Sequence, residues 1–79
     1  MKAKDMFEQL GYKIFENSYW IYLTKETTYY IDRISFIKSK KEIEIERFTG
    51  NKTLTKKISV LELKAINQQV KELNWDGDK

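Results

Sequence analysis

Histidine and cysteine are both absent from this chain of 79 residues. Their absence removes the commonest general base, the thiol nucleophile and metal sites built from imidazole or thiolate ligands. It also removes disulfide bonds, which agrees with an intracellular location. None of the serines therefore has a histidine to activate it, so we expect no enzymatic activity, no metal and no cofactor.

Proline is absent too, and the three glycines, Gly11, Gly50 and Gly77, lie far apart. This spacing excludes a glycine-rich phosphate loop and an internal flexible linker. No apolar run approaches the ~18 residues of a membrane-spanning helix, and charged residues after Met1 interrupt any signal peptide. We expect a single domain over residues 1–79 with no membrane segment, and a frayed tail over 76–79.

The net charge is only +3, but its distribution is uneven. The segment 38–57 carries seven basic and three acidic residues, and the rest of the chain is nearly balanced. Two interpretations remain open: lysines that protect the edge of a sheet from aggregation, or a patch that contacts phosphates. The nucleic-acid interpretation would use five residues of this segment: Lys40, Lys41, Lys52, Lys56 and Lys57.

A capping box is the clearest local signal that the sequence contains. Ser59 and Glu62 have the S-x-x-E spacing, in which each side chain bonds the backbone amide of the other residue. Apolar residues then recur at steps of three and four, as on a helix packed against a core. The predicted apolar stripe consists of Leu63, Ile66, Val70 and Leu73.

A short helix is predicted near the start of the chain. Its apolar face would hold Ala3, Met6, Phe7 and Leu10. Gly11 follows in the position that ends a helix in a Schellman motif, which would bring Tyr12 against Phe7.

Between these helices the sequence predicts five strands rich in Ile, Tyr, Phe and Thr. Their predicted bounds are 12–16, 19–25, 28–38, 42–48 and 52–58. Residues that favour turns separate them, at 17–18, 26–27, 39–40 and 50–51. Of these, Gly50-Asn51 is the strongest hairpin signal.

Treating each turn as an antiparallel hairpin places the large aliphatic residues on one face of the sheet. The predicted opposing pairs are Ile14–Ile21, Leu23–Tyr30, Ile34–Ile45, Phe36–Ile43 and Ile43–Ile58. Asp32 and Lys56 also fall on this face, where a bulge or a salt bridge with Arg47 would accommodate the aspartate. The predicted fold is therefore α+β: a helix, a five-stranded antiparallel meander and a C-terminal helix, in two layers with both helices on one face.

The opposite face of the predicted sheet carries large aromatic residues that neither helix would cover. Nearby, Glu46 is expected opposite Arg33 as a cross-strand charge pair. Three interpretations remain open: a minor core, a protein interface with a partner or a second copy, or a platform on which bases stack. The candidate residues are Phe15, Trp20, Tyr22, Tyr29, Ile31 and Arg33.

Both ends of the sequence resemble small uncharacterised proteins of phages and prophages of Gram-positive bacteria. The segments that carry the resemblance are KDMFEQLGYK at 4–13 and LELKAINQQVKELNW at 61–75. The resemblance implies an accessory protein of the bacterial cytoplasm that binds a host protein, and it assigns no functional residues.

The sequence thus favours a non-enzymatic protein-binding module, with homodimerisation as one form of that function. Nucleic-acid binding by the lysine-rich hairpin is the alternative hypothesis, and sequestration of a small nucleotide is a third.

Overall fold

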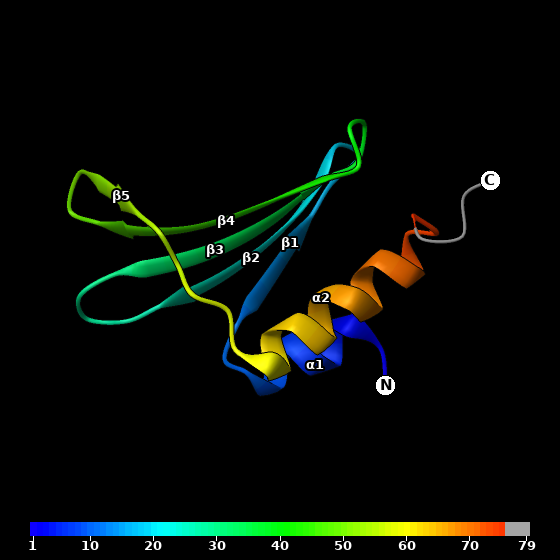
Figure 1. The fold of residues 1–79 in the computed structure, drawn as a ribbon, viewed down its shortest axis with the longest axis horizontal. Helices are drawn as coiled ribbons and strands as arrows, with labels where there is room; N and C mark the ends of the chain where they lie inside the picture. The colour runs from blue at the N-terminus through cyan, green and yellow to red at the C-terminus, as the bar shows by residue number, and fades with distance from the viewer. Residues whose placement is uncertain (76–79) are drawn as a thin grey trace.

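The chain folds into a five-stranded antiparallel sheet and two helices, and the computed structural model describes residues 1–75. Helix α1 (Ala3–Gln9) precedes the sheet and helix α2 (Val60–Glu72) follows it. The strands are β1 (Lys13–Glu16), β2 (Trp20–Glu26), β3 (Ile31–Ile37), β4 (Glu42–Thr49) and β5 (Lys52–Leu54). They pair in chain order, and α1 and α2 lie side by side against one face (Figure 1). The predicted α+β fold is confirmed, and the tail predicted over 76–79 lies outside the described residues.

The first two hairpins are offset from the predicted register. Ile14 lies opposite Leu23 rather than Ile21, and Leu23 lies opposite Ile34 rather than Tyr30. Both offsets are even numbers of residues, so every side chain keeps its predicted face. The aliphatic residues of the predicted inner face therefore still point toward the helices: Ile14, Ile21, Leu23 and Ile34.

The offsets arise because Asn17 and Thr27 precede the turns instead of occupying them. Asn17 Oδ1 accepts hydrogen bonds from the amides of Tyr19 and Trp20 at 2.7 Å and 3.0 Å. Thr27 Oγ1 accepts from the amides two and three residues further on, at 3.3 Å and 3.2 Å. Such side-chain bonds fix a turn over the residues that follow Asn or Thr.

The last two hairpins follow the predicted register, but β5 is shorter than expected. The β3–β4 hairpin contains both predicted pairs, Ile34–Ile45 and Phe36–Ile43. β5 ends at Leu54, so the predicted pair Ile43–Ile58 does not form. The chain from residue 55 to Ser59 instead crosses to the start of α2 as an extended linker.

Both predicted helix caps are present. Gly11 has φ +92°, its amide bonds the Glu8 carbonyl at 3.0 Å, and the Tyr12 amide bonds the Phe7 carbonyl at 3.1 Å. The rings of Phe7 and Tyr12 then meet edge to face at 5.7 Å, which completes the Schellman ending. At α2, the Glu62 amide donates to Ser59 Oγ at 3.0 Å and the Ser59 amide donates to the Glu62 carboxylate at 2.8 Å.

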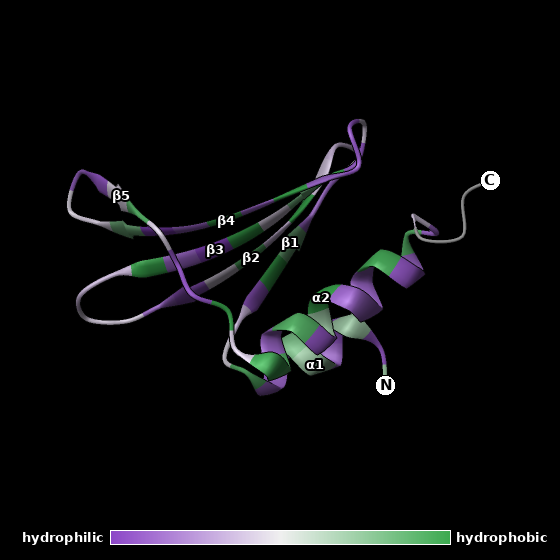
Figure 2. Ribbon diagram, in the orientation of Figure 1, coloured by the Kyte–Doolittle hydropathy of each residue, from purple (hydrophilic) through white to green (hydrophobic). Residues whose placement is uncertain are grey.

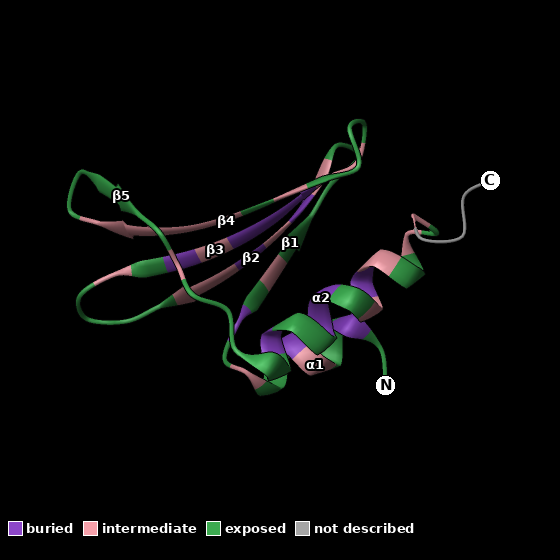
Figure 3. Ribbon diagram, in the orientation of Figure 1, coloured by how far each residue is buried: buried purple, intermediate pink, exposed green. Residues whose placement is uncertain are grey.

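The core lies between the helices and the inner face of the sheet, which we define as the face toward α1 and α2 (Figures 2 and 3). Phe7 packs edge-on against Phe36 at 6.5 Å. The buried apolar residues are Ala3, Phe7, Tyr12, Ile21, Leu23, Ile34, Phe36, Ala65 and Ile66.

Three of the four residues predicted for the apolar stripe of α2 lie toward the core: Ile66 is buried, and Val70 and Leu73 pack against it. Leu63 is the exception at 47% exposed, whereas Glu62 is buried in the first turn. Glu62 makes its bonds on the inner face, as described below. No helix in residues 1–75 has the length and apolar character needed to cross a membrane.

Candidate functional site

The outer face of the sheet, opposite the helices, carries a cluster of large side chains. Because residues alternate between faces along a strand, the residues that flank the buried positions in each strand form this outer set. Phe15 lies opposite Tyr22, and Ile31 lies opposite Phe48. We call the following set the aromatic face: Phe15, Trp20, Tyr22, Ile31, Arg33 and Phe48.

The rings of this face form a contiguous surface at the β1–β2 end. Trp20 and Tyr22 have centroids 5.3 Å apart, and Tyr19 lies 5.9 Å from Trp20. Phe15 is 55% exposed although it flanks Tyr22 across the strand pair. Within residues 1–75 both helices pack on the other side of the sheet (Figure 3), so neither covers these rings. Phe15 and Tyr19 are exposed, and Trp20 and Tyr22 are half-buried.

Arg33 occupies the centre of the aromatic face. Its guanidinium carbon lies 4.8 Å from the Phe48 ring centroid and 5.4 Å from that of Tyr22, within the range of cation–π attraction. It also forms the predicted cross-strand pair with Glu46, at 3.3 Å. Its side chain keeps 37% of its surface exposed, so the guanidinium is held in place without being enclosed.

The structure changes the predicted set at two positions. Tyr29 lies in the β2–β3 turn, 81% exposed and off the sheet, because Thr27 delays the start of β3 to Ile31. Phe48 was missed, although the predicted β3–β4 register already placed it opposite Ile31. The other predicted residues, Phe15, Trp20, Tyr22, Ile31 and Arg33, share the outer face.

The lysines of the nucleic-acid alternative do not gather on one surface. The side chain of Lys56 is only 5% exposed and is bonded to carboxylates, so it cannot contact phosphate. Lys40 and Lys41 lie in the β3–β4 turn, whereas Lys52 begins β5 at the opposite end of the sheet (Figure 1). Lys57 is exposed and follows Lys56 in the linker.

Charged residues also converge on the inner face, where the sequence placed Asp32 and Lys56 in conflict with the apolar pattern. Asp32 lies opposite Lys25 and Arg47 and takes both bonds of the Arg47 fork, at 2.7 Å and 3.0 Å. Lys56 Nζ lies 3.8 Å from the second Asp32 oxygen. Salt bridges therefore accommodate the aspartate, and β3 pairs continuously with both neighbours without a bulge.

Glu62 completes this group, which we call the inner polar cluster: Tyr12, Asp32, Arg47, Lys56 and Glu62. The Glu62 carboxylate accepts from Lys56 Nζ at 3.1 Å and from the Tyr12 hydroxyl. Burial acts to raise the pKa of Glu62, but the bonds from the Ser59 amide, Tyr12 and Lys56 outweigh it and lower the pKa to about 2. Burial, reinforced by Glu62, raises the pKa of Tyr12 above its ordinary value.

The inner polar cluster joins four separate parts of the chain, the first of which is Tyr12 after α1. Asp32 and Arg47 come from the sheet, Lys56 from the linker and Glu62 from the first turn of α2. Their side chains bond one another and the nearby backbone at Lys57 and Ser59. The side chains of Asp32, Lys56 and Glu62 are at most 9% exposed. We therefore assign the cluster to holding the linker and α2 against the sheet.

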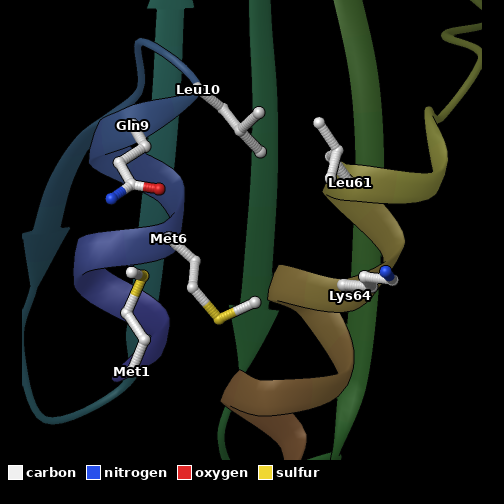
Figure 4. A pocket seen from close by; sticks show the side chains of 6 residues that line it. All are labelled: Met1, Met6, Gln9, Leu10, Leu61 and Lys64. Carbon is white, nitrogen blue, oxygen red and sulfur yellow. The ribbon is translucent and has the colours of Figure 1, made fainter.

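A shallow groove lies between the two helices (Figure 4). Its volume is about 150 Å³. Side chains of α1 and α2 face each other across it, with Leu61 60% exposed. The lining residues are Met1, Met6, Gln9, Leu10, Leu61 and Lys64.

Comparisons of the chain with protein-family models, with curated proteins and with solved structures found no significant match. A function for this chain is therefore inferred from its own residues and their geometry.

Proposed function

We propose that this chain is a non-enzymatic binding module that docks a partner protein on the aromatic face. The observation that carries the proposal is the contiguous set of rings around Arg33 on the side of the sheet away from both helices. Large exposed apolar patches on small domains mark interaction sites. Trp, Tyr and Arg are also the residue types that supply most of the binding energy in protein interfaces.

Trp20 and Tyr22 are the proposed anchors, because their tilted rings present a large surface that is already ordered. Arg33 would complement a carboxylate of the partner. It makes a single bond to Glu46, and a guanidinium carries five donors. The partner surface that fits best is therefore apolar with an acidic group near its centre.

The resemblance of both helical segments to phage and prophage proteins supports an accessory role in a bacterial cytoplasm. In that role the partner would be a host protein. This part of the proposal depends on the resemblance, whereas the docking face depends only on the geometry.

The test is retention of host proteins by the immobilised wild-type chain and by two variants, Trp20→Ala and Lys64→Ala. Trp20→Ala removes an anchor of the aromatic face, and Lys64→Ala changes an exposed residue of the helical layer. We expect proteins that the wild type and Lys64→Ala retain to be lost from Trp20→Ala, with thermal melting nearly unchanged. Unfolding of Trp20→Ala would make the ring part of the core, and equal retention by all three chains would remove the aromatic face as the site.

A further inference from the structure

Strand β1 forms one edge of the sheet, and its hydrogen-bonding pattern shows which backbone groups are directed outward. The Asn17 amide bonds the Trp20 carbonyl at 3.0 Å, and the Lys38 amide bonds the Tyr19 carbonyl at 2.9 Å. Bonded and non-bonded pairs alternate along an antiparallel ladder. Lys13 and Phe15 therefore bond β2, and the N–H and C=O groups of Ile14 and Glu16 point away from the sheet.

These outward groups lie on an accessible edge. Lys13, Phe15 and Glu16 are exposed and Ile14 is half-buried. Among residues 1–75, no other segment forms a backbone bond with Ile14 or Glu16. An edge strand with unpaired backbone groups is a template for another strand.

We propose that a second copy of this chain pairs with β1 in antiparallel orientation, about a twofold axis that passes beside Phe15. Such an axis keeps the two outer faces on the same side. Residues opposite each other in paired strands point to the same face, so Phe15 of one copy must oppose an outer-face residue of the other.

One register satisfies all the outward groups. With Phe15 opposite Phe15 of the second copy, Ile14 of each copy lies opposite Glu16 of the other. Both residues carry a free donor and a free acceptor, so the two strands form four backbone hydrogen bonds. A shift of two residues in one direction places Ile14 opposite Ile14 of the second copy, and a shift in the other direction places Glu16 opposite Glu16. In each case the remaining outward residue of β1 lies opposite the end of α1 or the β1–β2 turn, and not opposite β1.

The pairing explains why a phenylalanine is exposed on a short edge strand. Phe15 opposes its own copy in a non-hydrogen-bonded pair, in which Cβ atoms are about 5 Å apart. Tyr22 lies on the other side of Phe15, so the aromatic faces of two copies join into one surface. The pairing itself does not depend on the proposed partner-binding function.

Disulfide trapping tests this arrangement directly, because the chain has no other cysteine. Phe15→Cys places two thiols within bonding reach across the axis. Thr53→Cys is the matched control, since Thr53 is exposed, lies on the outer face and belongs to the other edge strand, β5. Under mild oxidation by glutathione disulfide we expect Phe15→Cys to form the covalent dimer several-fold faster; equal rates would overturn the proposal.

A second comparison separates backbone pairing from contact through side chains. Glu16→Pro removes an outward N–H without breaking a bond to β2, as proline does on edge strands, and Glu16→Ala is its control. Both substitutions are made in the Phe15→Cys chain. We expect Glu16→Pro, but not Glu16→Ala, to lower the rate of disulfide-dimer formation to that of Thr53→Cys. A rate that stays above that of Thr53→Cys with Glu16→Pro would overturn edge pairing. Trp20→Ala should leave trapping intact, so failure of partner binding and failure of pairing are distinguishable.

Discussion

Two arginines, one on each face of the sheet, make the same kinds of contact with different geometry. On the inner face, Arg47 forms a fork with Asp32 at 2.7 Å and 3.0 Å, and its guanidinium lies 3.7 Å from the ring centroid of Tyr30. On the outer face, Arg33 makes one contact with Glu46 at 3.3 Å and lies about an ångström or more further from its two rings.

The difference lies in the solvent exposure of the carboxylates. The Asp32 side chain is 5% exposed and the Glu46 side chain is 30% exposed. A buried ion pair is costly to break, because the remaining charge loses its partner in a medium of low dielectric constant. An accessible pair is screened by water and contributes little. The inner group therefore stabilises the fold, and the outer group remains available for binding.

Removing the inner carboxylate should have the largest effect. Asp32→Ala removes the buried carboxylate that binds Arg47 and leaves Lys56 with Glu62 as its remaining counter-ion. We expect the free energy of unfolding to fall by about 3 kcal/mol, because Arg47 loses its fork while staying partly exposed. Urea denaturation followed by circular dichroism measures the change. A loss below about 1 kcal/mol would place Asp32 among ordinary surface ion pairs and remove the contrast between the two faces.

Acidification should weaken the inner face selectively, through Glu62. Its folded-state pKa of about 2 lies below the ordinary glutamate value of 4.5, so its contribution is present above pH 4.5 and is lost as the pH falls toward 2. The shift corresponds to a loss on the order of 3 kcal/mol. Urea titrations between pH 6 and pH 2.5 (roughly the window that this linkage defines) should show a smaller decline for Glu62→Gln than for the wild type. Parallel curves would contradict this assignment.

Removing the N-cap of α2 should have an intermediate effect on stability. Ser59→Ala removes the hydroxyl that accepts from the Glu62 amide, and we expect a loss of about 1 kcal/mol, as for other helix N-caps. Ser39→Ala, in the exposed β3–β4 turn, is the control in the same urea experiment. If both variants lose equal stability, the effect does not come from the cap.

The outer carboxylate should have the smallest effect. Glu46→Ala removes the partner of Arg33 from a partly exposed site, and we expect a loss of no more than about 1 kcal/mol. Urea denaturation of Glu46→Ala and Asp32→Ala under identical conditions compares the two arginine pairs directly. A loss as large as that of Asp32→Ala would show that the outer face is also structural.

The fold could be predicted because several local signals agree. Hairpin parity, the Schellman ending at Gly11 and the capping box at Ser59 each depend on residues close together in the chain. The turn positions were harder to predict, because Asn and Thr can stabilise a turn from the position before it as well as occupy it. Most of the aromatic face followed from parity alone, and only the delayed start of β3 removed Tyr29.

The inner polar cluster could not be predicted in full, since its members are distant in sequence. The alternating sequence pattern predicted that the last strand continues through Lys56. In the structure, bonds to Asp32 and Glu62 hold that lysine in a linker. Glu62, which also bonds that lysine, is buried on the side of α2 that faces the sheet, and Leu63 is exposed. Tertiary charge pairing thus shortened the predicted strand and displaced one residue, Leu63, from a helical stripe whose other members pack on the core.

The contact between the two helices has a consequence for biosynthesis. The Ala3 amide donates to the Glu72 carboxylate at 2.7 Å, which joins residues 69 positions apart. While a ribosome is still making α2, α1 has no helical neighbour, and the inner face of the sheet lacks the cover that Ala65 and Ile66 provide. A nascent chain therefore exposes part of its apolar sheet face until α2 emerges, which makes that interval the natural point for a chaperone to act.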